Sequence, residues 1–169
     1  MVMKQDGPKA LLEAVEEAMI PWVFIVHGHD GESVLSVERC LDRLGTQPIV
    51  LRDLPGSGKT IIEKFEHYAS GSCFAVVLLT PDDLGGKNED PPSLNPRARQ
   101  NVIFELGFFF AKLGRPRVVG LVKEGRAKLD LPSDSLGIQY IHMDSGKGWQ
   151  LELAKELENA GITVDRSEL

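Results

Sequence analysis

Short apolar runs alternate with amphipathic stretches along most of the chain. An apolar run of four to eight residues that ends in turn residues is typical of a strand buried in a parallel sheet. Runs of this kind predict strands at 22–30 (where the run ends in a glycine turn), 48–51, 73–79, 117–122 and 137–141.

The amphipathic stretches carry apolar residues three and four positions apart, which predicts helices. They cover residues 8–19, 32–44, 61–69, 98–114 and 148–161. The stretch at 98–114 is apolar on nearly every side, so we expect it to be a central helix. Strands that alternate with helices predict an α/β protein with a parallel sheet covered on both faces. Five strands fit a three-layer, flavodoxin-like fold with the sheet order 2-1-3-4-5.

The pattern predicts one folded domain at residues 21–161, preceded by a helix or linker at 1–20 and followed by a short tail at 162–169. A polar stretch rich in Gly, Pro and Asp at 80–96 predicts a long loop. Loops of that length inside a compact domain are usually functional or disordered.

Composition changes this picture little. The chain of 169 residues has a formal net charge of −6, which argues against direct nucleic-acid binding. No apolar run approaches the ~20 residues that cross a bilayer, and the N-terminus lacks a signal-peptide pattern. We therefore expect a cytoplasmic protein without membrane contact.

The stretch "RDLPGSGKT" at 52–60 is similar to a phosphate-binding loop. Such a loop needs glycine where this chain has Asp53, whose side chain and charge would occupy the place of phosphate oxygens. In addition, Thr60 and Glu63 have the spacing of a capping box, which engages the threonine hydroxyl. The stretch is therefore predicted to be a glycine-rich connector before a helix, and a phosphotransferase that depends on Lys59 is the less favoured alternative.

Polar residues collect where ligands bind in this kind of fold, beyond the carboxyl ends of strands 1 and 3. Arginines beside helix N–H groups suit a pyrophosphate, and aspartates suit ribose hydroxyls. Taken singly, each residue is equally consistent with a turn, a cap or a solvated surface; their convergence favours a binding site. No metal is expected, because two histidines without a third ligand are weak evidence for one. The candidate ligand-binding residues are His27, Gly28, His29, Asp30, Thr80, Asp82, Asp83, Arg97, Arg99, Gln100 and Asn101.

Glu105 stands in the apolar segment "NVIFELGFFF" with no basic residue three or four positions away. An ionised carboxylate on so apolar a helix is costly unless it faces a crevice or an external partner. The alternative is a glutamate on the one solvated edge, stabilised by an early position in the helix. The sequence leaves both open, and the helix can begin near Asn95 or near Asn101.

The segments "VFIVHGHD", "TIIEKFE", "VVLLTPDD", "RARQNVIFELGFF" and "LPSDSLGIQYI" resemble bacterial TIR-like domains, the effector modules of anti-phage signalling systems that include fusions to STING domains. The resemblance covers roughly residues 22–160. It implies a TIR fold and NAD⁺ glycohydrolase activity that releases nicotinamide, with NAD⁺ as substrate and no further cofactor. Glu105 matches the family's catalytic glutamate, and the turn from His27 to Asp30 matches its nucleotide-facing turn.

The resemblance also implies a loop that gates the site and mediates assembly, formed here by Leu54, Pro55, Gly56, Ser57, Gly58 and Lys59. Lys59 stands where many members carry arginine. Activation through homo-oligomerisation is implied, with a cyclic-dinucleotide sensor such as STING in the same chain or a partner. We interpret the chain as an excised effector domain or as a subunit activated by a partner. A non-catalytic nucleotide-binding or assembly scaffold is the alternative.

The implied chemistry suits a single carboxylate. Nicotinamide leaves NAD⁺ as a neutral molecule because the pyridinium already carries the positive charge, so no general acid is required. Enzymes that cleave O-glycosides need two carboxyl groups because an alkoxide must be protonated. One anion near the developing oxocarbenium ion can therefore suffice, and we assign that role to Glu105.

Overall fold

The computed structural model describes residues 20–53, 58, 60–123, 125, 128–132 and 137–169. Its main sheet is parallel and has five strands in the order β2-β1-β3-β6-β7. This is the predicted order 2-1-3-4-5, because β6 and β7 are the fourth and fifth strands of the sheet. The strands are β1 (Trp22–Val26), β2 (Gln47–Val50), β3 (Phe74–Leu79), β6 (Val118–Val122) and β7 (Gln139–His142).

The described residues also form four α-helices and two 3₁₀ turns; all but α5, which follows the last strand, lie between strands of the main sheet. They are α2 (Gly31–Arg43), η1 (Leu51–Asp53), α3 (Ile61–Gly71), α4 (Gln100–Leu113), η2 (Arg115–Arg117) and α5 (Gly148–Asn159). The helix predicted at 8–19 lies outside the described residues. No helix in the described part of the chain is long and apolar enough to span a bilayer.

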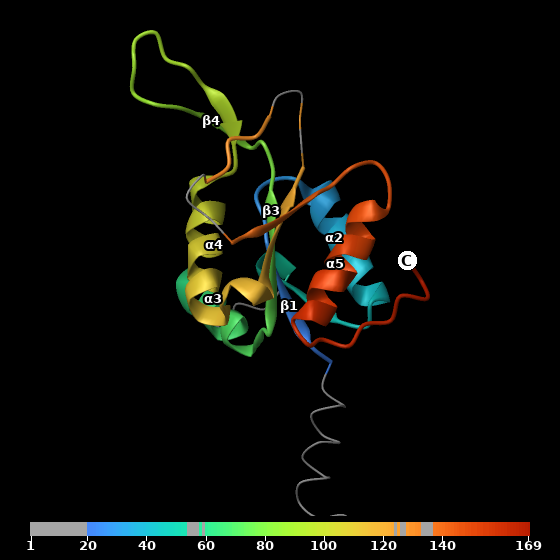
Figure 1. Cartoon of the computed structure of the whole chain (residues 1–169). Helices are drawn as coiled ribbons and strands as arrows, with labels where there is room; N and C mark the ends of the chain where they lie inside the picture. Colours follow the sequence, from blue (N-terminus) through green and yellow to red (C-terminus); the bar gives the residue numbers. More distant parts are fainter. Residues whose placement is uncertain (1–19, 54–57, 59, 124, 126–127, 133–136) are drawn as a thin grey trace, which may run out of the picture.

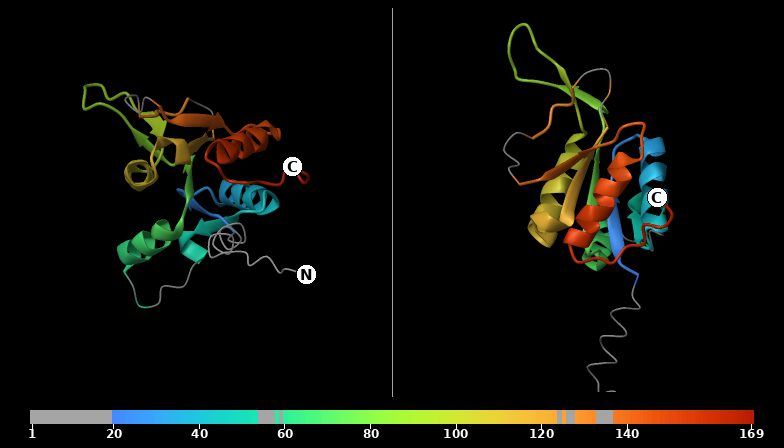
Figure 2. Two further views of the ribbon diagram at one scale, coloured as in Figure 1. Left: turned by 60° about the horizontal axis from the view of Figure 1, so that its bottom comes forward. Right: turned by 45° about the vertical axis from the view of Figure 1, so that its right-hand side comes forward.

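The helices form two layers around the sheet (Figure 1). On one face, α2 and α5 pack against side chains of β1, β3 and β6, in a cluster that includes Val37, Leu41 and Leu153. On the other face, α3 and α4 bury Phe65, Val102 and Phe109. All six residues of β3 are buried, because this central strand is covered on both faces. The two views of Figure 2 show the same three layers from the side and from below.

Part of the segment predicted to be a loop at 80–96 forms a β-ribbon instead. β4 (Asp83–Gly85) pairs in antiparallel fashion with β5 (Asn95–Arg97), and residues 86–94 connect them. The ribbon projects beyond the edge at which the parallel strands end (Figure 1). Its Pro and Gly residues concealed the pairing from sequence patterns, since both are depleted in strands.

The C-terminal segment lies against the domain. Ile162 is buried with the α2 and α5 cluster, and Val164 and Leu169 pack against that cluster. The backbone N–H of Asp165 donates to the carbonyl oxygen of Leu44 at 3.1 Å. Residues 162–169 therefore contribute contacts to the face formed by α2 and α5.

Candidate functional site

Helix α4 begins at Gln100, which places Glu105 in its second turn. The later of the two possible helix starts is therefore close to the observed one. Arg99 is the N-cap residue and makes no side-chain capping hydrogen bond. Among the described residues, no capping side chain therefore satisfies the backbone N–H groups of the first turn of α4.

Glu105 lines a cavity of about 310 Å³, which we call the Glu105 cavity. Phe24 and Ile25 from β1 and Leu51 from η1 provide apolar walls. The polar side chains that share it with Glu105 are His27, Arg52 and Lys64, and exposed Ile61 completes the lining. The carboxyl group thus faces a crevice, which decides between the two alternatives that the sequence left open.

Burial raises the pKa of Glu105 to about 7, and the positive charge of Arg99 lowers it by a smaller amount. Arg99 is six residues earlier in the chain, so a search at three and four positions missed it. No described residue forms a hydrogen bond or ion pair with the Glu105 carboxyl group. A desolvated and unpaired carboxyl group in a cavity is typical of a functional site, because its charge is stabilised only when a cation binds.

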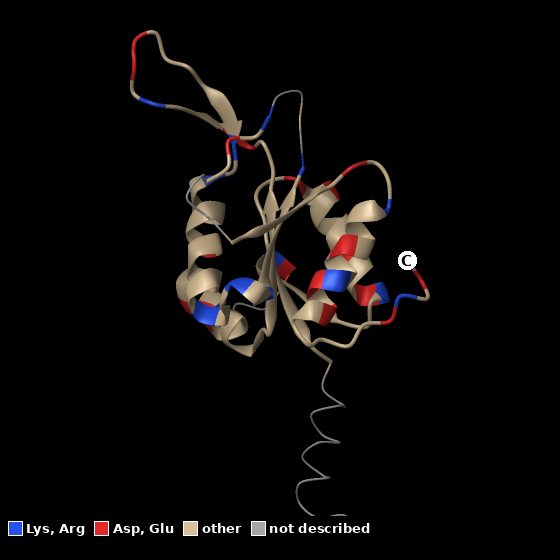
Figure 3. Ribbon diagram, viewed as in Figure 1, with Lys and Arg blue, Asp and Glu red and all other residues tan. Residues whose placement is uncertain are grey.

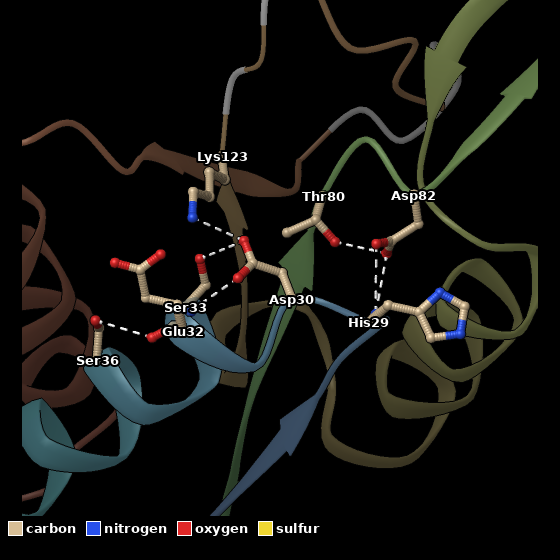
Figure 4. Close-up of polar contacts among 8 residues, drawn as sticks. All are labelled: His29, Asp30, Glu32, Ser33, Ser36, Thr80, Asp82 and Lys123. Carbon is tan, nitrogen blue, oxygen red and sulfur yellow. Dashed lines mark hydrogen bonds and ion pairs between the residues drawn. The ribbon is translucent and has the colours of Figure 1, made fainter.

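The predicted turn after β1 lies beside this cavity. His27 Nδ1 and the carbonyl oxygen of Gly28 are 2.8 Å apart. Asp30 caps α2, since its Oδ1 accepts from the backbone N–H of Ser33 at 3.1 Å, and its Oδ2 forms an ion pair with Lys123 Nζ at 2.8 Å (Figure 4). Burial raises the pKa of Asp30, but the hydrogen bonds from Lys123 and Ser33 outweigh it, so the pKa is lowered overall. Asp30 thus fixes the start of α2.

Asp82 joins the turns that follow β1 and β3. Its carboxylate accepts from the Thr80 hydroxyl at 2.6 Å and from the backbone N–H of His29 at 3.4 Å (Figure 4). A Cβ atom at position 28 would meet Asp82 Oδ2 at 1.8 Å, so this close approach requires Gly28. The carboxylates of Asp30 and Asp82 are therefore engaged within the protein, in positions that shape the turn beside the Glu105 cavity.

The remaining predicted residues lie elsewhere. Arg97 and Gln100 line a second cavity of about 420 Å³, which we call the Arg97 cavity. Asp83 is the cross-strand partner of Arg97 in the ribbon, and Asn101 is exposed. Acidic and basic segments adjoin at the base of the ribbon (Figure 3). Of the predicted binding residues, His27 therefore lines the Glu105 cavity, Arg97 and Gln100 line the Arg97 cavity, and the others line neither of them.

The glycine-rich stretch is described only in part. Leu54, Pro55, Gly56, Ser57 and Lys59 lie outside the described residues, and Gly58 has a positive φ of 74°. The predicted capping box is confirmed: Thr60 Oγ1 accepts from the backbone N–H of Glu63 at 3.3 Å, and Glu63 Oε2 accepts from that of Thr60 at 2.8 Å.

Sequence reasoning missed three basic residues. Arg52 and Lys64 line the Glu105 cavity, and Lys123 holds Asp30. A signal for the first was available, because Arg52 follows β2, the neighbour of β1 in the predicted order. Lys64 lies in the first turn of α3, and only the folded path of the chain brings it to the cavity.

The strand order is that of a flavodoxin-like α/β fold, and it is consistent with a TIR-like domain. The model of the TIR domain of CAP12/Pycsar effector proteins matches residues 22–145, and the chain belongs to this family. The resemblance to bacterial TIR-like effector domains is thereby confirmed.

The relatives include proteins from bacteria and from an amoeba. YuaY from Escherichia coli (strain K12) is 44% identical over 144 residues, which are 85% of this chain and 47% of YuaY. Protein tirC from Dictyostelium discoideum is 38% identical over 143 residues, 81% of this chain and 68% of tirC. CD-NTase-associated protein 12 from Flavobacterium daejeonense is 34% identical over 97 residues, 54% of this chain and 28% of that protein. The chain thus spans about half the length of YuaY and less of CD-NTase-associated protein 12.

Proposed function

We propose that the domain is an NAD⁺ glycohydrolase that cleaves the bond between nicotinamide and ribose. The observation that carries the proposal is the carboxyl group of Glu105, desolvated and unpaired among the described residues in a cavity beside the end of β1. Membership of a TIR effector family supports it. The cavity of about 310 Å³ lies at the lower end of the range for ligand pockets, which suits the nicotinamide riboside half of the substrate.

Cleavage breaks the bond between C1′ of the ribose and the pyridinium nitrogen. The bonding electron pair goes to that nitrogen, nicotinamide leaves as a neutral molecule, and an oxocarbenium ion remains on the ribose. The Glu105 carboxylate stabilises this cation. Water then attacks C1′ and loses a proton, which gives ADP-ribose. The substrate's own positive charge favours ionised Glu105, whose pKa in the empty cavity is about 7.

The cations that line the cavity suit the diphosphate. Lys64 is half-buried, and its side chain forms no hydrogen bond or ion pair with any described residue. Arg52 is 3.9 Å from Glu38 and 3.3 Å from Asp53 in exposed ion pairs, which are weak and easily exchanged for a phosphate. His27 lines the same cavity as these cations. Lys64 and Arg52 therefore replace Arg97 in the role that the sequence suggested for it.

The signalling context is also part of the proposal. CD-NTase-associated protein 12 is named for its association with a CD-NTase, and the matching family model is the TIR domain of CAP12/Pycsar effector proteins. We infer that this domain acts in anti-phage defence. A cyclic-nucleotide signal would activate it through a sensor, such as a STING domain, in the same chain or in a partner. Homo-oligomerisation would couple the signal to cleavage. Exposed Phe104 and Ile61 near the cavity supply apolar surface for contacts between copies.

Nicotinamide release from NAD⁺ tests the function. Glu105→Gln keeps the shape of the side chain and removes the negative charge, so we expect kcat/KM to fall about 100-fold or more. Glu152→Gln changes an exposed glutamate on α5 in the same way and serves as the control, with activity expected to equal that of the parent. Cleavage by Glu105→Gln at the parent rate would contradict the assignment. If dinucleotide binds but the active signalling assembly releases no nicotinamide, the non-catalytic scaffold is favoured.

A further inference from the structure

The Arg97 cavity is separated from the Glu105 cavity by the body of α4. Gln100 and Ile103 line the Arg97 cavity, and Glu105 lines the other. With 3.6 residues per turn, Glu105 points about 140° away from Gln100 and about 160° away from Ile103. The two cavities therefore lie on opposite sides of the helix, and one cavity-filling ligand cannot use Glu105 and Arg97 in the same pocket.

The guanidinium group of Arg97 has a buried N–H donor that lacks a hydrogen-bond acceptor among the described residues. Its Nε is fully buried and has no hydrogen-bond partner, and the group forms no ion pair with any described residue. The backbone of Arg97 pairs with that of Asp83 in the ribbon and forms an isolated β-bridge with that of Asp130, and these contacts hold the residue in place. Its guanidinium lies against Gly85, where a Cβ atom would meet Arg97 Cζ at 2.3 Å. An unpaired, half-buried cation is costly, and an anionic ligand would offset that cost.

The other walls of the cavity complement an anion that carries a sugar and a base. The carboxylate of Asp130 forms no ion pair with a described residue, which leaves it able to accept from ribose hydroxyls. Ile103, Leu131 and Pro132 supply apolar surface. The free N–H groups of the first turn of α4 lie beside Arg97, since the helix is uncapped. A volume of about 420 Å³ is in the range of small-molecule pockets.

We propose that the Arg97 cavity is a second site, which binds a nucleoside phosphate separately from the substrate in the Glu105 cavity. Arg97 binds the phosphate, Asp130 binds the ribose hydroxyls, and the apolar wall contacts the base. The site shares α4 with Glu105, so a nucleotide bound there stabilises the helix that carries the catalytic carboxylate. The proposal does not depend on NAD⁺ cleavage, because it concerns binding on the other side of the helix.

Titration with AMP, followed by amide NMR and calorimetry, tests this site. The experiment uses the Glu105→Gln chain, so that any cleavage activity is silenced and failure here is independent of the proposed function. We expect AMP to perturb amides at 97–103 and 129–132. Arg97→Gln should weaken AMP binding at least tenfold, and Lys64→Gln, which removes a cation from the Glu105 cavity, should leave it unchanged.

Further probes separate the ligand classes and guard against a folding defect. Inorganic phosphate and adenosine should each bind at least tenfold more weakly than AMP, because each lacks part of the recognised group. Ile103→Trp fills the cavity from the helix side and leaves the sequence of the ribbon unchanged, and it should also weaken AMP binding tenfold or more. Perturbation confined to residues 24–27, 51–52 and 61–64, equal binding of phosphate and AMP, or no binding at millimolar AMP would overturn the proposal.

Discussion

The two cavities beside α4 are built on different supports. The Glu105 cavity is walled by Phe24, which packs against Phe65 and Phe109 with ring centroids 5.5 and 4.9 Å apart. The Arg97 cavity is walled by the ribbon and by residues 130–132, at the periphery of the sheet. Aromatic packing in the core fixes the first, while strand register and one arginine fix the second. The Glu105 cavity therefore tolerates fewer substitutions in the core residues that support it.

The cavities also differ in the charge that they can accommodate. The first holds the Glu105 carboxyl group, which has no partner among the described residues and is stabilised by an approaching cation. The second holds the Arg97 guanidinium, which has no ion-pair partner in the same part of the chain and is stabilised by an anion. A single helix thus separates a site suited to a developing positive charge from a site suited to phosphate. The experiments below separate the two sites, beginning with the largest expected effect.

Phe109→Ala removes the ring beneath the Glu105 cavity. Phe109 is fully buried and contacts Phe24, Phe65 and Phe108, so we expect the free energy of unfolding to fall by about 3–5 kcal/mol. Phe104→Ala on the same helix is the matched control, because that ring is 67% exposed; its effect should stay within about 0.5 kcal/mol. Chemical denaturation measures both. Similar losses in the two variants would show that the core does not support the cavity as described.

The pH dependence of stability reports the burial of Glu105. Its pKa is about 7 in the folded domain and near 4.5 when the chain is unfolded, so the folded state binds more protons between these values. The contribution of Glu105 to the free energy of unfolding is therefore fully present below about pH 4.5 and is lost as the pH rises through about 7. Glu105→Gln does not ionise, and we expect it to exceed the parent in stability above pH 7 by about 1–2 kcal/mol, after allowance for solvent screening.

Denaturation of both proteins at pH 5 and pH 8 measures that difference, and no gain for Glu105→Gln at pH 8 would contradict a buried carboxyl group. Cleavage of NAD⁺ should change in the opposite direction, because the carboxylate is the active form: kcat/KM should rise as the pH rises through about 7. His27 lines the same cavity, so the profile of His27→Gln distinguishes an imidazole from Glu105 as the titrating group.

The sequence predicted the architecture well, because buried parallel strands and amphipathic helices have different hydrophobic periods. It also drew attention to Glu105, an acid without a nearby base on an apolar helix, and the structure places this residue in a cavity; its catalytic role stays a prediction. It wrongly grouped Arg97 with the ligands of the Glu105 cavity. Arg97 and Glu105 are close in sequence, at the start of α4 and within it. Which side of the helix each residue reaches depends on where the helix begins. The start at Gln100 is not signalled by a capping side chain.

The roles of Asp30 and Asp82 show another limit. The sequence places both at strand ends, where ligands bind, but it does not reveal that Lys123 and Thr80 already engage them. Lys123 is 93 residues from Asp30 in the chain. A contact over that separation depends on the pairing of β3 with β6, which the strand order predicts only coarsely.

Gly85→Ala separates the second cavity from the first with a smaller effect. The added methyl group would displace the Arg97 guanidinium, a flexible group, so the free energy of unfolding should change by less than about 1 kcal/mol. AMP binding at the Arg97 cavity should nevertheless weaken roughly five- to tenfold, about 1 kcal/mol. Release of nicotinamide should stay at the parent level. Unchanged AMP affinity would mean that the position of Arg97 does not matter for that site.

Thr60→Ala tests how firmly the first cavity is supported at its rim. The Thr60 cap holds the first turn of α3, which carries Ile61 and Lys64 to the Glu105 cavity. We expect a loss of about 0.5–1 kcal/mol in unfolding free energy, with a KM for NAD⁺ a few-fold higher and AMP binding at the Arg97 cavity unchanged. Ser70→Ala, which removes a hydroxyl bonded to the Glu66 carbonyl oxygen within the same helix, is the control and should change neither property measurably. If Thr60→Ala weakened AMP binding as well, the two sides of α4 would be coupled through α3, and the separation of the cavities by the core would be wrong.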